Sequence, residues 1–150
     1  MKLNQKGYDL IKSFEGLSLK PYKCSAGVAT IGYGNTYYEN NVKVQMSDAV
    51  ITKKRAEDLL KISADRYAFK VDNLVHKPIT QNQFNALVSF AYNVGSGALA
   101  SSTLLKKVNV NPNDAMIAKE FLRWNKAKGV TLAGLTTRRI KESALYFTTL

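Results

Sequence analysis

Glu15 is the residue of this sequence whose type and setting best suit acid–base chemistry. It follows Phe14 at the end of an expected helix, and no other Asp or Glu occurs between it and Glu39. A carboxyl group among apolar neighbours can have its pKa raised by desolvation, which suits a general acid. The alternative is a surface glutamate at a helix end, and composition alone favours that alternative.

A short hairpin after this helix could bring a thiol and a hydroxyl together. Residues 25–27, Ser-Ala-Gly, fit a three-residue loop whose glycine takes the left-handed conformation. That register pairs Cys24 with Val28 and Tyr22 with Thr30, so Cys24 and Thr30 become diagonal neighbours on one face. Such a pair could hold one water molecule. The plainer interpretation is a small buried cysteine and an ordinary strand threonine.

Cys24 could serve in three ways: as a nucleophile, as a packing residue or as a group that positions water. A nucleophilic thiol needs a lowered pKa, and no histidine or basic residue other than Lys23 adjoins Cys24 in the sequence. We favour water positioning, in which the sulfur acts as a weak hydrogen-bond partner beside Thr30.

Other conspicuous residues give weaker signals. His76 is the only histidine and has no Cys or His nearby, so neither a metal site nor a cofactor is expected. Gly32-Tyr33-Gly34 is too short for a dinucleotide-binding loop. Trp124 could stack on a sugar, but its helical spacing from Phe121 favours the core. Arg139 could lie on a solvated helix face.

The apolar pattern predicts a small sheet followed by a mostly helical body. Glycines and β-branched residues between Leu17 and Tyr38 indicate short strands and turns. A capping box formed by Thr80 and Gln83 begins a central helix that Gly95 ends. Further helices are expected over residues 3–14, 53–74 and 103–108, from Pro112 to Gly129, and from Thr137 onward. We expect one α+β domain, residues 1–150, with a ligand cleft between its two parts.

The charge of the chain is its unusual bulk property. The sequence has 22 Lys and Arg against 11 Asp and Glu, a net charge of +11. Such a field attracts polyanions such as nucleic acid, peptidoglycan with its peptide carboxylates, or anionic outer-membrane lipid; solubility alone is the other explanation. The N-terminus lacks a signal-peptide core, and no apolar run reaches the about 18 residues of a membrane span. We therefore expect synthesis and folding in a cytoplasm.

Three separated motifs resemble those of the phage lysozyme (endolysin) family. The first is the spacing of Glu15, Cys24 and Thr30, within Phe14-Glu15-Gly16 and Thr30-Ile31-Gly32-Tyr33-Gly34. The others are residues 83–95 and residues 121–124 with 134–139. The resemblance spans nearly the whole chain. It implies a lysozyme-like fold, with a small N-terminal β-sheet lobe, a mostly helical body and the active-site cleft between them.

The resemblance also implies a function and roles for individual residues. The enzyme would hydrolyse the β-1,4 bonds between N-acetylmuramic acid and N-acetylglucosamine in bacterial peptidoglycan and so cause host lysis. Glu15 would protonate the leaving oxygen, Thr30 would hold the attacking water, and Cys24 stands where many members have an aspartate. A neutral thiol stabilises positive charge on the sugar poorly. The supporting residues would be Tyr33 and Gly34 lining the cleft, Tyr92 and Asn93 facing the sugar, and Arg139 paired with Glu15. The protein would act as a monomer, reaching the wall through a holin.

The spacing of Asp and Glu residues favours an inverting over a retaining mechanism, but it leaves other functions open. A retaining glycosidase needs a second carboxylate about 5 Å from the first; none lies between Glu15 and Glu39, so we expect inversion. The same lack allows a lytic transglycosylase, in which a hydroxyl of the sugar attacks instead of water. A basic nucleic-acid-binding module rests on charge alone and lacks any recognised motif. The set of Glu15, Cys24 and Thr30 argues against a catalytically dead relative.

Overall fold

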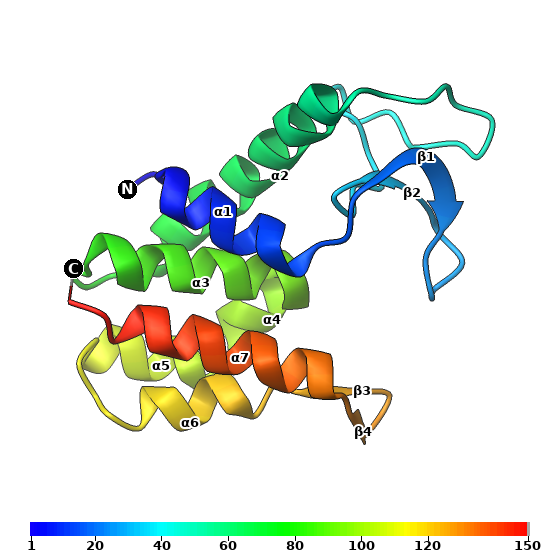
Figure 1. The fold of residues 1–150 in the computed structure, drawn as a ribbon. Coiled ribbons are helices and arrows are strands. Elements are labelled where there is room, and N and C mark those ends of the chain that lie inside the picture. The colour runs from blue at the N-terminus through cyan, green and yellow to red at the C-terminus, as the bar shows by residue number, and fades with distance from the viewer. Residues whose placement is uncertain (150) are drawn as a thin grey trace. The chain divides into compact units, whose positions relative to one another are not determined.

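The computed structural model describes residues 1–149, which divide into two compact units. Unit 2 is Tyr8–Arg66, and unit 1 is Met1–Gly7 with the chain from Tyr67 onward. Within residues 1–149, no helix has both the length and the apolar character needed to cross a membrane. The elements (Figure 1) are α1 Gln5–Phe14, β1 Ser18–Lys23, β2 Ala29–Gly32, α2 Lys53–Leu74, α3 Gln81–Val94, α4 Ser96–Ser101, α5 Thr103–Val110, α6 Ile117–Leu122, β3 Lys126–Ala127, β4 Val130–Thr131 and α7 Ala133–Tyr146.

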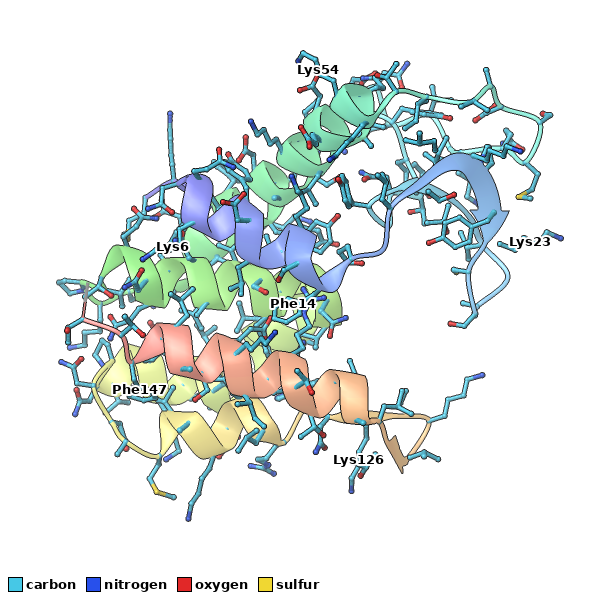
Figure 2. The ribbon with its side chains drawn as sticks, in the orientation of Figure 1. Lys6, Phe14, Lys23, Lys54, Lys126 and Phe147 are labelled. Atoms are coloured by element: carbon cyan, nitrogen blue, oxygen red, sulfur yellow. The ribbon has the colours of Figure 1, made fainter. Side chains whose placement is uncertain are left out.

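Unit 2 is built on the antiparallel hairpin of β1 and β2. Tyr22 pairs with Thr30 and Lys23 with Ala29, and the register shifts between Ser18 and Tyr22. The amide of Cys24 donates to the carbonyl of Val28 at 3.0 Å, which extends the predicted register to the loop. In Figure 2 the side chain of Lys23 points outward from this hairpin. The hairpin prediction is therefore confirmed.

Polar contacts hold the long loop after β2 against the first half of α2. Asn35 is buried, and its amide nitrogen donates to Ser63 Oγ at 2.7 Å and to the Leu59 carbonyl at 3.3 Å. Arg55 meets both carboxylate oxygens of Glu39 at 2.6 Å. These contacts lie beside an apolar core drawn from α1, β2, the loop and α2: Ile11, Ile31, Val44, Ala56, Leu59 and Leu60.

Unit 1 is organised around α3, which lies alongside α7 (Figure 1). The predicted capping box is present: the Thr80 side chain accepts from the Gln83 amide, and the Gln83 side chain accepts from the Thr80 amide. Gly95 ends the helix at φ 96°, as predicted. Aromatic rings join α3 to α6 and α7, since Phe121 lies 5.7 Å from both Phe90 and Tyr146 by ring centroids.

Gly7 lies inside the first helix, where glycine has a poor helix propensity, and the packing around it explains its presence. Asn4 begins the helix, because its Oδ1 accepts from the Gly7 amide at 3.2 Å. A Cβ atom on Gly7 would lie 2.6 Å from Leu3 Cδ2 and 2.8 Å from Asn85 Oδ1. The glycine therefore permits close packing inside unit 1, which outweighs its poor helix propensity.

The segment between α5 and α7 differs from the prediction of one helix from Pro112 to Gly129. The side chain of Asp114 accepts from the Met116 amide, so residues 111–116 form turns and α6 begins only at Ile117. After α6 the chain makes the hairpin β3–β4. Lys128 and Gly129 both have positive φ, 50° and 78°, the pattern of a two-residue hairpin turn.

The boundaries of two other helices also differ. The last helix begins at Ala133 instead of Thr137, and the short helix α4 was not expected. The sequence predicts a helix end at Gly129, whereas the positive φ of this residue serves the hairpin turn.

Candidate active site

Glu15 lies directly after α1 in unit 2 and is half-buried. Gly34, which follows β2, approaches its carboxyl group closely. A Cβ atom built on Gly34 would lie 3.1 Å from Glu15 Oε2 and 3.7 Å from Glu15 Cδ. Gly34 also has φ +85°, where residues with a side chain are strained. Two independent features, the close approach and the backbone conformation, therefore favour glycine beside this carboxyl group.

Most other carboxylates of unit 2 have partners of their own. The Arg55 guanidinium lowers the pKa of Glu39, and the Gln45 amide, followed by the Tyr38 hydroxyl, lowers the pKa of Asp48. The remaining printed contacts are Glu57 with Lys12, Asp58 with Lys54, and Asp65 with the Tyr8 hydroxyl. Among residues 1–149 no group of three or more His, Cys, Asp or Glu side chains could hold a metal ion.

The hairpin brings Cys24 and Thr30 together on one face. The Gly27 amide donates to the Cys24 carbonyl at 2.8 Å, and Gly27 has φ +77°, as the three-residue loop requires. Thr30 is buried, and its hydroxyl donates to the Val28 carbonyl at 2.9 Å. The hydroxyl has one proton, for which the Val28 carbonyl and the Cys24 sulfur are both acceptors within reach, and its oxygen keeps lone pairs that can accept a hydrogen bond from water.

The thiol of Cys24 has a lowered pKa. The backbone of Val28 lowers this pKa most and the backbone of Ala26 next, each through a hydrogen bond to the sulfur. The Thr30 hydroxyl lowers the pKa by a smaller amount. The expectation that a lowered pKa would need a basic neighbour is therefore wrong, because backbone amides at the hairpin loop supply the stabilisation. The same contacts confirm that Cys24 and Thr30 are neighbours.

Tyr33 and Trp124 differ in how much of each ring solvent can reach. Tyr33 is 4% exposed, and Lys12 Nζ lies 5.9 Å from its ring centroid. A role for Tyr33 in lining a cleft stays a prediction, but little of its ring is accessible. Trp124 is half-buried and packs edge-on against Phe90 at 5.6 Å. The expected core packing of Trp124 is confirmed, with part of the indole left at the surface.

In unit 1, Arg139 is fully buried in a network that the sequence reasoning missed. Its Nε lies 3.0 Å from Glu142 Oε1, an ion pair whose angle is too bent for a hydrogen bond. Its Nη2 donates to Asn93 Oδ1 at 2.7 Å, and its guanidinium lies 4.9 Å from the Phe90 ring centroid. Burial lowers the pKa of Arg139 to about 10, so the side chain remains a cation at neutral pH.

Glu142 also binds the neighbouring Arg138, whose Nε donates to Glu142 Oε2 at 3.2 Å. Burial raises the pKa of the Glu142 carboxyl against the opposing effect of the two guanidinium groups. The solvated-face interpretation of Arg139 is therefore wrong. The i, i+3 and i, i+4 spacing of these three residues was the available signal.

The remaining predicted substrate residues also lie in unit 1. Tyr92 is half-buried, with its ring 5.4 Å from that of Tyr67, and Asn93 is exposed. The expected pair of Arg139 with Glu15 would join residues of different units and stays a prediction. His76 is exposed, and its backbone amide donates to Asn109 Oδ1 at 2.7 Å.

Known proteins resemble this chain over most of its length. A family model described as Phage lysozyme matches residues 12–142. An endolysin of Bacillus phage PZA is 47% identical over 148 residues, which cover 97% of this chain and 55% of that relative. This chain thus spans about half the length of that curated relative.

Two solved structures are similar throughout. The endolysin from Escherichia coli O157:H7 phage FAHEc1 superposes with a TM-score of 0.90 at 39% identity, covering 100% of this chain and 96% of that one. The muramidase domain of SpmX from Asticaccaulis excentricus gives 0.85 at 36% identity, covering 98% of each chain.

Proposed function

Because the chain belongs to the phage lysozyme family of glycoside hydrolases, we propose that it hydrolyses the β-1,4 bonds between N-acetylmuramic acid and N-acetylglucosamine in peptidoglycan. The observation that carries this proposal is the Glu15 carboxyl set against Gly34, in the same unit as the Cys24–Thr30 pair. The solved relative named a muramidase domain supports the bond that we propose. Cutting this bond would lyse the host cell.

Glu15 is the general acid of the proposed reaction. It donates a proton to the glycosidic oxygen as the bond to the leaving sugar breaks. Protonation by a positioned side chain contributes on the order of 10²–10⁴ in rate. A side chain at position 34 would crowd the Glu15 carboxyl, so glycine there keeps open the position from which the carboxyl donates, and such catalysis depends on that geometry.

Water held by Thr30 and Cys24 is the proposed nucleophile, and the proposed outcome is inversion. A retaining enzyme needs a second carboxylate about 5 Å from the acid. In unit 2 the carboxylates of Glu39, Asp48 and Glu57 are engaged with other partners. Thr30 accepts a hydrogen bond from the water, and the sulfur of Cys24, whose pKa is lowered by backbone hydrogen bonds, lies beside Thr30 as a second partner for that water.

The proposed substrate contacts come from both units. Tyr33 and Gly34 lie in unit 2, and Tyr92 and Asn93 lie in unit 1. Arg139 of unit 1 is the proposed supporting partner of Glu15: its guanidinium stays positively charged at neutral pH, and the partners of its Nε and Nη2 are Glu142 and Asn93. No cofactor takes part in the proposed reaction, and we propose a monomer that reaches the wall through a holin after synthesis in the host cytoplasm.

The uneven distribution of charge supports peptidoglycan as the partner. Unit 1 holds 13 of the 22 Lys and Arg but 4 of the 11 Asp and Glu, a net charge of +9, whereas unit 2 has 9 against 7, a net of +2. A basic unit attracts the peptide carboxylates of the wall and, in Gram-negative hosts, anionic outer-membrane lipid. The nucleic-acid alternative rests on this charge alone, and we do not propose it.

The test compares Glu15→Gln with Glu39→Gln on purified peptidoglycan. Glu39 is a suitable control because its carboxylate forms an exposed ion pair with Arg55. Glu15→Gln should fold normally and fail to clear the suspension, whereas Glu39→Gln should clear it at nearly the parent rate. Near-normal clearing by Glu15→Gln would contradict the assignment.

The products of the parent enzyme identify the reaction. Hydrolysis adds one water to each cut, which mass spectrometry detects, while a lytic transglycosylase leaves an anhydro end. Proton NMR of fresh product should show the α-anomer first. An initial β-anomer would require a nucleophile other than water.

A further inference from the structure

Unit 1 contains a hollow that the proposed reaction does not use. It has a volume of about 340 Å³ and lies where α4 ends, α5 begins and α6 ends. Its size falls at the lower end of the 300–1,000 Å³ typical of ligand pockets, which is enough for one sugar ring. Six residues line it: Ser101, Ser102, Thr103, Glu120, Arg123 and Trp124.

The wall of the hollow is held in place by packing and capping. Trp124 meets Phe90 edge-on, with ring centroids 5.6 Å apart at 89°, and remains half-buried. Ser102 accepts from the Leu105 amide at 3.0 Å and donates to the Leu99 carbonyl at 2.7 Å, so its hydroxyl is committed to the helix start. The indole is therefore fixed in orientation and partly accessible.

Two charged side chains complete the lining. Arg123 Nη1 donates to Glu120 Oε1 at 3.0 Å; the Glu120 side chain is 10% exposed, whereas that of Arg123 is 67% exposed. Within residues 1–149, Glu120 is the one carboxylate that Arg123 contacts. A guanidinium carries five N–H donors, so the exposed Arg123 keeps donors for an outside carboxylate.

The surroundings of the hollow are positively charged. Lys119 on α6 and Lys126 and Lys128 on the β3–β4 hairpin are exposed, and no ion pair within residues 1–149 involves them. Figure 2 shows Lys126 at the hairpin, pointing away from the helices. These cations raise the local concentration of anionic ligands.

We propose that this hollow is a second, non-catalytic carbohydrate site, which takes an N-acetylated sugar with a carboxylate close to it. In the wall the lactyl group of a muramyl residue is amide-linked to the stem peptide, whose own carboxylates lie close to the sugar; free N-acetylmuramic acid presents the carboxylate on its lactyl group. The apolar face of the sugar lies on Trp124, hydroxyls of Ser101 and Thr103 bind its polar edge, and Arg123 binds the carboxylate. The site rests on the proposed function, because it holds a second part of the glycan while Glu15 acts elsewhere on the strand. It lowers KM for the polymer and leaves the bond-breaking step unchanged.

The single tryptophan makes the site directly observable. Trp124 is the only Trp in the chain, so one indole N–H cross-peak in a ¹H–¹⁵N spectrum reports on the hollow. We expect N-acetylmuramic acid to move this cross-peak saturably, N-acetylglucosamine to bind more weakly, and lactate to leave it unmoved. The first two sugars differ by the lactyl group, which carries the carboxylate.

Arg123→Gln and Lys119→Gln form a matched pair of variants. Each removes one exposed cation from the same stretch of chain, but Lys119 does not line the hollow. Arg123→Gln should weaken N-acetylmuramic acid binding by roughly tenfold or more, since it removes a charged hydrogen-bond donor. Lys119→Gln should weaken binding by less than about twofold, because it removes only a solvent-screened attraction and no contact with the ligand. On whole peptidoglycan, Arg123→Gln should raise KM with kcat unchanged.

Three outcomes would contradict the proposed site. The first is an indole cross-peak that does not move in the parent, and the second is equal N-acetylmuramic acid binding by Arg123→Gln and the parent. The third is an equal shift with lactate and with N-acetylmuramic acid, which would indicate an anion site only. The titration requires no catalysis, so Glu15→Gln must show the parent's binding curve. Failure of the proposed reaction and failure of this site therefore give different results.

Discussion

Replacing Gly34 with alanine tests whether the Glu15 carboxyl acts from the position seen in the structure. The new Cβ atom would lie 3.1 Å from Glu15 Oε2, whereas ordinary contacts begin near 3.4 Å. The carboxyl must therefore retreat by about 0.3 Å or more, unless the backbone of residue 34 moves instead. Alanine at φ +85° adds backbone strain of about 1–2 kcal/mol.

The two effects have different sizes and different readouts. Misplacing a catalytic group by 1 Å can cost about 100-fold, so a shift of roughly 0.3–0.5 Å predicts a four- to ten-fold loss of kcat. The strain alone predicts a fall in Tm of about 2–8 °C for a chain of this length.

Gly129→Ala separates strain from contact. Gly129 has a similar φ, +78°, but an added Cβ there would meet no atom within 4 Å. Both variants should lose similar stability in thermal melts followed by circular dichroism. Clearing of peptidoglycan, measured well below both Tm values, should be slowed only by Gly34→Ala. Equal clearing by the two variants would refute the reasoning, since the carboxyl would then tolerate displacement or would not be the acid.

Three further predictions follow from the same structure. Cys24→Asp should remain active, Cys24→Ala should lose part of its rate and Cys24→Leu nearly all, because leucine fills the space of the water; a glycosyl adduct on Cys24, seen by intact mass, would instead identify a nucleophile. Binding to wall fragments should weaken steeply between about 50 and 500 mM salt as screening shortens the field of unit 1; indifference to salt would contradict a role for its charge. Glu142→Ala should lower the free energy of unfolding by about 3–5 kcal/mol, because it leaves Arg138 and Arg139 buried without their carboxylate; urea titration showing a loss under about 1 kcal/mol would contradict that account.

Features that depend on hydrogen bonds between near neighbours in the chain could be predicted from the sequence. The capping box at Thr80 joins residues three apart, and the register of the hairpin at Cys24 follows from one loop and one glycine. The family and the α+β, lysozyme-like fold were also predicted, and the family match over residues 12–142 and a TM-score of 0.90 confirm them. Motif spacing and apolar periodicity carry that information without any knowledge of packing.

The helix predicted between Pro112 and Gly129 is wrong, because residues typical of helix ends are also typical of turns. Pro112 and Gly129 are typical of the start and the end of a helix, and together they predicted one helix between them. The side chain of Asp114 instead caps a turn, and Lys128 with Gly129 makes a hairpin. Pro112 and Gly129 do mark places where the chain turns or an element ends. Only the packed structure shows whether each place is a helix boundary, a turn or a hairpin.

Contacts between distant segments were decided by tertiary structure alone. Arg139 is buried because α7 packs on α3, which brings Asn93 and Phe90 to a residue more than 40 positions away. The thiol of Cys24 has a lowered pKa through backbone amides, which no residue type in the sequence reveals. Gly34 appears in the sequence as one glycine among nine, and only the folded chain places it against Glu15, because the loop after β2 returns to the end of α1. The sequence thus determined which groups could do the chemistry, and packing determined the surroundings that set their charge and position.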